Sequence, residues 1–558
     1  MTGLISRPDS TSQRQRHQLQ VSGLVQGVGF RPFVYTLANT LGLVGWIKNT
    51  RQGVVIEVEG QASQLHQFQQ RLQRDKPLHA VVQRVELTKL EPIGYTNFEI
   101  HHSDPSNAAG ETLTQPAALI LPDLATCPDC LAELFDRRDR RHHYPLINCT
   151  HCGPRYSIVR SLPYDRGNTT MQTFQMCPDC QRDYDDPGDR RFHAQPTACH
   201  HCGPYLEFWD QQGQVLAAHE AALQQGVAAI RNGQILAVKG LGGFHLMADA
   251  TNNAAVIRLR QRKHRPDKPF AVMYPNLGSL RDQCQVSDAE AELLTSAIAP
   301  IVLVAIKNTQ IPFAIAPATN PDNPHLGVML PYTPLHHLLL RQLGHPIIAT
   351  SGNLSGTPLC CDNNDALEKL GTIADGFLVH NRPIEQAVDD SIVRFVKLPT
   401  GQQQPMILRR ARGYAPLPIP LPKQAKDDPQ PIILAVGGHL KNTIALYSND
   451  RLLVSQHVGD LDTMAGCDRF QQTIQHLCHL YHLHPTHIAH DLHPDYYSTQ
   501  FAKQAVDSGQ WTVGSEPAEG SSPDSKCKIQ NSKLPNPSTP QLHPVQLHPV
   551  QHHYAHLL

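Results

Sequence analysis

The chain has 558 residues, of which 40% are hydrophobic and 17% charged, with a formal net charge of −1. This length exceeds what one hydrophobic core supports, so roughly three or four domains are expected. The near-neutral charge argues against general electrostatic attraction to nucleic acid, and no apolar run approaches the ~20 residues that span a bilayer, so neither nucleic acid nor a membrane is an expected partner.

The first segment, residues 1–17, is polar and lacks the apolar stretch of a secretory signal. We therefore predict a disordered start and a cytoplasmic protein.

Residues 18–103 alternate strand and helix patterns in a βαββαβ order, which predicts a ferredoxin-like α+β domain. Pro32 is expected to open the first helix. The predicted segments are Leu19–Leu24, Pro32–Leu41, Gly45–Asn49, Val54–Glu59, Ser63–Arg74, Val81–Leu90 and Phe98–His101.

The loop after the first strand can close around an anion, because its glycines let backbone N–H groups converge and Arg31 adds positive charge. The loop residues are Gln26, Gly27, Val28, Gly29 and Phe30. This loop and the later GWIKN segment, which ends at Asn49, resemble the acylphosphatase signature. The resemblance implies that Arg31 binds a phosphoryl group and that Asn49 orients the attacking water. The alternative is a tight turn with a surface arginine.

Eight cysteines between residues 120 and 205 form four CxxC pairs, in two repeats with equal spacing. They are Cys127, Cys130, Cys149, Cys152, Cys177, Cys180, Cys199 and Cys202. Four thiolates complete a tetrahedral Zn²⁺ site, so two structural zinc ions are expected, with no catalytic role. Neighbouring pairs could share an ion, or the first pair could join the fourth. His151 and His201 could replace a thiolate, but solvent-facing histidines are favoured.

The remaining cysteines show no such spacing and are interpreted as ordinary residues. They are Cys284, Cys360, Cys361, Cys467, Cys478 and Cys527. A zinc ribbon that binds nucleic acid is the main rival interpretation of the CxxC pairs, and the interleaved aspartates of the segment argue against it.

Residues 218–415 alternate helical and strand patterns, beginning with a helix at 217–232 and a strand at 235–239, which predicts an α/β domain. A cluster of cations and a Ser/Gly-rich loop suggest a phosphate cradle for ATP. The motifs resemble the YrdC/Sua5-like domain, which makes a carbamoyl-type adenylate. Residue by residue, the resemblance implicates Lys239, Lys263, Arg265, Lys268, Ser351, Asn353 and Ser355. A solvated surface without catalysis is the alternative.

Residues 431–558 begin with a strand at 432–436, a glycine turn and a hairpin-like stretch at 443–454. With the DLHPDYY motif they resemble part of an actin-like, Kae1-type α/β domain. Residues 508–540 are rich in Ser, Pro and Lys and are predicted to be a disordered insertion. His552 and His556 are spaced i, i+4 in a VQHHxAH motif, so on a helix both could bind one divalent metal ion; incidental surface histidines are the alternative.

These motifs, in this order, resemble the HypF family of carbamoyltransferases in [NiFe]-hydrogenase maturation. The resemblance implies that carbamoyl phosphate and ATP are substrates, that Mg²⁺ accompanies ATP, and that the acceptor is a HypE-type protein. A tRNA-modifying carbamoyl-adenylate synthase, or a zinc-ribbon binding module with degenerate catalytic domains, are the other hypotheses. Since family members continue beyond the histidine motif, we also expect a C-terminally truncated or split form with impaired final transfer.

Overall fold

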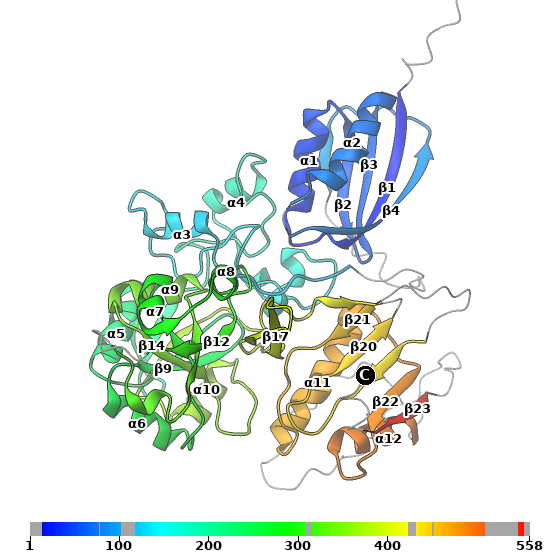
Figure 1. The fold of residues 1–558 in the computed structure, drawn as a ribbon. Helices are drawn as coiled ribbons and strands as arrows, with labels where there is room; N and C mark the ends of the chain where they lie inside the picture. Colours follow the sequence, from blue (N-terminus) through cyan, green and yellow to red (C-terminus); the bar gives the residue numbers. More distant parts are fainter. Residues whose placement is uncertain are drawn as a thin grey trace, which may run out of the picture. The chain divides into compact units, whose positions relative to one another are not determined.

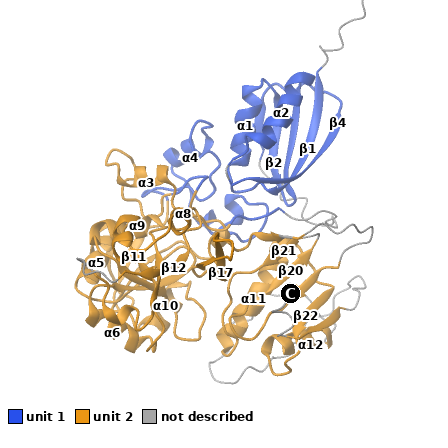
Figure 2. Cartoon of the chain, in the orientation of Figure 1, with its two compact units in different colours: residues 1–121, 148–151, 159–202 blue, residues 122–147, 152–158, 203–558 orange. Residues whose placement is uncertain are grey.

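The structure is a computed structural model that describes residues 14–77, 79–101, 118–307, 314–421, 431–448, 451–507 and 545–551. Figure 1 shows its ribbon. The chain divides into two compact units, coloured separately in Figure 2. Unit 1 contains residues 1–121, 148–151 and 159–202, and unit 2 contains residues 122–147, 152–158 and 203–558. Among the described residues, no helix combines the length and the apolar character that crossing a bilayer requires.

Unit 1 contains a sheet with the strand order β4-β1-β3-β2-β5 and two helices that pack on it. Side chains alternate between buried and half-buried along β2, as expected of a strand with one face in a core. Leu65, Phe68 and Leu72 of α2 are buried. The elements are β1 (Gln15–Leu24), α1 (Phe30–Thr40), β2 (Val44–Thr50), β3 (Gly53–Gly60), α2 (Ala62–Arg74), β4 (Val81–Leu90) and β5 (Phe98–Ile100).

This sheet confirms the ferredoxin-like prediction but corrects two boundaries. Strand β1 begins at Gln15, so the last residues of the expected disordered start are ordered by antiparallel pairing with β3. Helix α1 begins at Phe30 and not at Pro32, because Gly29 takes the left-handed conformation, φ 75°, directly before it. Residues 1–13 lie outside the described residues.

The cysteine-rich segment has little regular structure, as expected where metal ligands and not a hydrophobic core would hold the chain. Its two α-helices, α3 (Pro128–Phe135) and α4 (Pro178–Asp185), each begin with a proline that follows the first cysteine of a CxxC pair. The short 3-10 helices are η2 (Tyr156–Ile158), η3 (Arg166–Asn168) and η4 (Thr170–Thr173).

Unit 2 contains a large mixed sheet with the order β17-β16-β12-β13-β10-β14-β9-β8-β15-β6-β7, and β11 pairs with β12. Its strands are β6 (Leu206–Trp209), β7 (Val215–Ala218), β8 (Leu236–Lys239), β9 (Phe244–Asp249), β10 (Val272–Met273), β11 (Cys284–Gln285), β12 (Ile301–Ile306), β13 (His325–Met329), β14 (Ile347–Ser351), β15 (Gly376–His380), β16 (Ile392–Lys397) and β17 (Gln403–Arg409). The flanking helices are α5 (His219–Arg231), α6 (Asn253–Arg262), α7 (Leu277–Gln283), α8 (Asp288–Thr295), η5 (Pro317–Thr319), α9 (Pro334–Leu343) and α10 (Asn363–Leu370).

The predicted helix at 217–232 starts two residues late in the structure. Ala217 and Ala218 belong to β7, which pairs antiparallel with β6, so sheet pairing overrides their helix propensity. The rest of the helix and the following strand agree with the prediction.

A third sheet, also in unit 2, has the order β18-β21-β20-β19-β22-β23. Its elements are β18 (Pro418–Pro420), β19 (Ile433–Ala435), β20 (Ala445–Ser448), β21 (Arg451–Val454), α11 (Met464–Tyr481), β22 (His487–Asp491), α12 (Tyr497–Asp507) and β23 (Gln546–Val550). Strands β20 and β21 pair antiparallel, as the hairpin-like pattern predicted. The predicted insertion at 508–540 and the two histidines, His552 and His556, lie outside the described residues.

Candidate functional site

The predicted anion loop lies between β1 and α1 and is fixed to the neighbouring hairpin. Gly27 and Gly29 both have positive φ, 71° and 75°, which a side chain would strain. The Gln26 side-chain amide donates to Thr50 O at 2.6 Å and Gly53 O at 2.7 Å. The loop is therefore held against the strand pair that carries Asn49.

Arg31 and Asn49 lie together at this loop, and both are largely buried, with 8% and 2% of their surface exposed. They share a contact, because Asp165 Oδ1 accepts from Arg31 Nη2 at 2.8 Å and from Asn49 Nδ2 at 3.4 Å. Within the described structure, Asn49 Oδ1 is buried without a hydrogen-bond partner. A free acceptor beside a guanidinium is the arrangement needed to hold a water molecule next to an anion.

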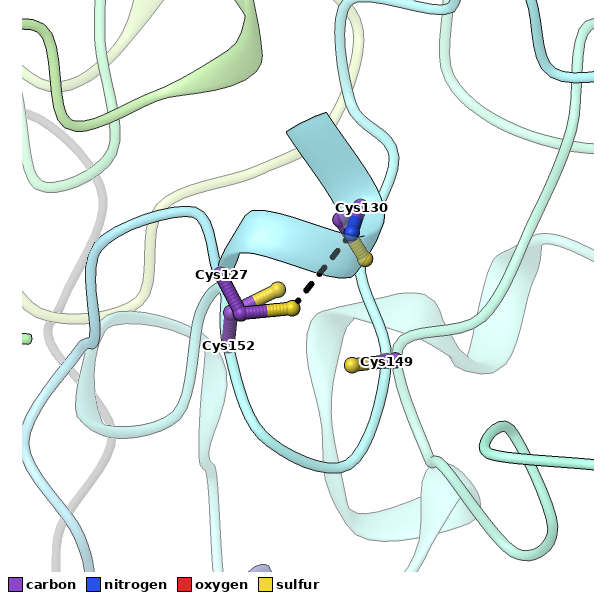
Figure 3. Close-up of side chains that lie close together, drawn as sticks. All are labelled: Cys127, Cys130, Cys149 and Cys152. Carbon is purple, nitrogen blue, oxygen red and sulfur yellow. Dashed lines mark hydrogen bonds between the residues drawn. The ribbon is translucent and has the colours of Figure 1, made fainter. Parts of the chain in front are cut away.

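The eight cysteines form two groups of four, each with its sulfur atoms within 4.8 Å of one another. Cys127, Cys130, Cys149 and Cys152 form the first group, whose side chains converge in Figure 3. There the Cys130 N–H donates to Cys127 Sγ at 3.5 Å, the backbone support that a CxxC turn gives a thiolate. The sequence left open whether the first pair joins the second or the fourth, and the structure joins neighbouring pairs.

The second group consists of Cys177, Cys180, Cys199 and Cys202. Sulfur–sulfur distances of 3.8 Å from Cys177 to Cys199 and 3.9 Å from Cys199 to Cys202 match the edges of a tetrahedron around one ion. Hydrogen bonds from Cys180 and then Cys202 lower the pKa of the Cys199 thiol, which favours the thiolate that zinc requires. Both groups therefore fit zinc, while His151 and His201 are exposed and stand outside the two groups.

A cavity of about 920 Å³ in unit 2 collects most of the predicted nucleotide residues. Its lining includes Lys263, Arg265, Lys268, Ser351, Asn353 and Ser355. Three cations and several hydroxyl and amide groups thus face one space. This is the chemistry of a polyphosphate site.

Lys263 joins the two predicted motifs. It caps the C-terminus of α6, and its ammonium group donates to Ser351 O at 2.7 Å, to Asn353 O at 2.7 Å and to Asn353 Oδ1 at 3.0 Å. Burial, followed by the nearby Arg265, lowers the pKa of Lys263 to about 7. Burial also lowers the pKa of Arg265, to about 10. Such shifts are expected of cations gathered before an anion arrives.

The Ser/Gly loop that follows β14 needs glycine for close packing. A Cβ on Gly352 would lie 2.5 Å from Phe244 Cβ and 2.8 Å from Phe244 O. Ser355 Oγ donates back to Lys263 O at 3.1 Å, which ties the loop to the end of α6. The loop is thus held in place before any ligand binds.

Lys239 does not line the large cavity. Its ammonium donates to Asn363 Oδ1 at 2.6 Å and His380 O at 3.2 Å, beside a separate cavity of about 30 Å³. Burial lowers the pKa of Lys239 to about 8. The structure therefore separates Lys239 from the six residues with which the sequence grouped it.

Sequence reasoning missed several residues of these sites. Arg260 fixes the loop that carries Arg265 and Lys268, because its guanidinium donates to Arg265 O at 2.8 Å and to Lys268 O at 3.1 Å. Asp389 lines the large cavity, and its neighbour Asp390 accepts from buried Arg412 at 2.8 Å. The two aspartates lie in the segment Val388-Asp-Asp-Ser391, a polar stretch that could have found them, whereas Arg260 is one of several cations in a charged run and carries no signal of its own.

The glycine turn of the third sheet reaches the large cavity through Lys441, and Asp460 from a later segment lines the same cavity. The Lys441 N–H donates to Asp460 Oδ1 at 2.7 Å, and the Asn442 side chain closes the turn on Val436 O at 2.9 Å. Gly437 has φ 66°, and a Cβ there would clash with the Thr443 carbonyl. The loop therefore exists as predicted.

Four family profiles match the chain, in five consecutive stretches. They are Acylphosphatase at residues 17–100, HypF finger at 126–159 and 176–209, the Sua5/YciO/YrdC profile described as telomere recombination at 228–411, and HypF Kae1-like domain at 428–558.

Individual proteins agree. The chain is 53% identical over 485 residues to a Synechocystis sp. protein named carbamoyltransferase HypF, and 44% identical over 525 residues to carbamoyltransferase HypF2 of Cupriavidus necator. These matches cover 87% and 91% of the chain but 61% and 63% of the relatives, so the chain spans about three fifths of their length. The crystal structure of full-length HypF in its phosphate- and nucleotide-bound form matches with a TM-score of 0.80 and 41% identity, over 89% of this chain and 62% of that one.

Proposed function

The chain belongs to the HypF family over the four domains that it contains, and on this premise we propose that it activates carbamoyl phosphate with ATP for carbamoyl transfer. The observation that carries the proposal is the convergence of Lys263, Arg265 and Lys268 with the Ser/Gly loop on one cavity. The HypF finger and HypF Kae1-like profiles favour this branch over a tRNA-modifying synthase.

The reaction begins at the anion loop. Arg31 binds the phosphoryl group of carbamoyl phosphate, and Asn49 orients a water molecule that attacks phosphorus, releasing carbamate and inorganic phosphate. Oδ1 of Asn49 is the acceptor available for that water. A carbamate oxygen then attacks the α-phosphorus of ATP in the large cavity and pyrophosphate leaves, giving carbamoyl adenylate.

The final step transfers the carbamoyl group to the C-terminal cysteine thiolate of a HypE-type acceptor, and AMP leaves. This step belongs to the synthesis of the cyanide ligands of [NiFe] hydrogenase in the cytoplasm. Mg²⁺ accompanies ATP because it neutralises phosphate charge during substitution, and the carboxylates of Asp389 and Asp460 line the same cavity. His552 and His556 would hold a further divalent ion.

The first measurement is carbamoyl-phosphate-dependent exchange of pyrophosphate into ATP. Exchange is expected in the parent and should fall roughly a hundredfold or more in Arg31→Ala, because the phosphoryl group loses its charged donor. Arg84→Ala, at an exposed arginine on β4, is the matched control.

Freshly dissolved carbamate should restore exchange in Arg31→Ala, since it bypasses hydrolysis. A zinc-loaded parent without any exchange would contradict the proposal and favour a binding module. Exchange in the parent that is untouched by Arg31→Ala would reject the hydrolytic step alone.

A further inference from the structure

We infer that Asp165 is a positioning residue whose carboxylate occupies the anion-binding position of the Arg31 and Asn49 site. It competes there with phosphate. The inference rests on the proposed hydrolytic function of this site. All the residues involved belong to unit 1. Its first support is the ion pair, in which Asp165 Oδ1 lies 2.8 Å from Arg31 Nη2, on a guanidinium whose side chain is only 9% exposed.

The residue before Asp165 contacts two further side chains of the site. Asn49 Nδ2 donates to Tyr164 O at 3.2 Å, and Tyr164 N donates to Gln26 Oε1 at 2.8 Å. A carboxylate on the guanidinium and a carbonyl on the amide are the oxygens that an acyl phosphate would supply. Tyr164 and Asp165 therefore occupy side-chain donors of Asn49 and Arg31 that the substrate needs.

Hydrogen bonds of the neighbouring residue fix the backbone position of Asp165. Arg166, the next residue, donates to Thr197 O at 2.9 Å and to Phe174 O at 2.7 Å, and its N–H donates to Gln195 Oε1 at 2.7 Å. Gln195 and Thr197 lie shortly before Cys199 of the second cysteine group. The side chain of Asp165 does not cap the 3-10 helix η3 that it precedes, a use common for aspartate at that position.

The competition has a predictable sign. The Asp165 carboxylate is tethered and therefore faces Arg31 at high effective concentration, so a phosphate must displace it. The apparent affinity of phosphate is then the intrinsic affinity multiplied by the fraction of sites from which the carboxylate is absent. A phosphate dianion carries more charge and more acceptor oxygens than one carboxylate, so it can still displace Asp165 from Arg31. After hydrolysis, the return of Asp165 to Arg31 favours release of inorganic phosphate.

The test is Asp165→Asn in the full chain, with Asp185→Asn on the exposed end of α4 as the matched control. Loss of the competing charge should lower KM for carbamoyl phosphate and Ki for inorganic phosphate, each by roughly tenfold, the size of one charge-assisted hydrogen bond. The value of kcat should change much less than KM. A purely structural role would lower kcat and zinc content together and leave Ki unimproved.

Binding of inorganic phosphate, followed by ³¹P NMR, keeps the two proposals distinguishable. Tighter binding in Asp165→Asn that disappears when Arg31→Ala is added supports competition, even if no variant hydrolyses carbamoyl phosphate, in which case only the hydrolytic proposal fails. Unchanged or weaker phosphate binding in Asp165→Asn would overturn the inference. Asp165→Ser, also neutral, replaces the Asn variant if that variant fails to load zinc.

Discussion

Lys263 shows how strongly one residue of the large cavity depends on its surroundings. The three oxygens that it contacts use all three hydrogens of an ammonium group. Burial opposes that charge and lowers the pKa to about 7 from the ordinary 10.5. The folded chain therefore binds fewer protons than the unfolded chain between these values, and this group makes the free energy of unfolding rise with pH across that window.

Nucleotide binding should reverse the shift, because polyphosphate stabilises the ammonium form. We expect the affinity for Mg-ATP to fall by more than roughly tenfold from about pH 7 to about pH 9, with proton uptake on binding that rises from about half a proton at pH 7 to close to one at pH 9. Calorimetry in buffers of different ionisation enthalpy measures both quantities. In Lys263→Arg, whose charge does not titrate in this range, the pH dependence should vanish; an unchanged slope would assign it to another group.

The sequence predicted the positions of helices and strands better than it predicted contacts between distant residues. Residue spacing located the strands of the first sheet to within a few residues, because alternation between a buried and an open face is a local property. The start of α1 was missed because the left-handed conformation of Gly29 ends the loop, so that the helix begins at Phe30, two residues before Pro32. The start of α5 was missed because β6, not the local sequence, decides the conformation of Ala217 and Ala218.

The cysteine elements permit a direct prediction. Cys180→Ser should reduce bound zinc from about two ions to about one per chain, because three thiolates no longer close the second tetrahedron. Metal analysis of the desalted protein measures this. Cys478→Ser is the control, since Cys478 is buried in α11 outside both groups and should leave the zinc content unchanged. Loss of both ions from Cys180→Ser would contradict two separate sites.

At the scale of the whole molecule, contacts between distant segments limited what could be predicted. Motif order identified the domains, but Asp165 lies 134 residues from Arg31 and belongs to no motif that names it. Lys239 is the opposite case: its motif grouped it with the other predicted nucleotide-binding residues, whereas the fold places its ammonium group beside His380. Sequence spacing cannot predict which residues Asp165 and Lys239 contact, because these contacts depend on how distant segments pack together.

The division into two units leads to the last prediction. The anion loop belongs to unit 1 and the large cavity to unit 2, so each ligand should slow amide exchange in its own unit. Inorganic phosphate should protect peptides covering residues 23–31, and Mg-ATP should protect those covering 349–359 and 457–460, as measured by hydrogen–deuterium exchange and mass spectrometry. Protection is expected because a ligand that binds only the native site lowers the population of locally open states. Arg31→Ala should abolish the phosphate effect and leave the ATP effect intact. If phosphate instead protected residues 349–359 and left the anion loop unchanged, the assignment of Arg31 as the phosphoryl-binding residue would be wrong.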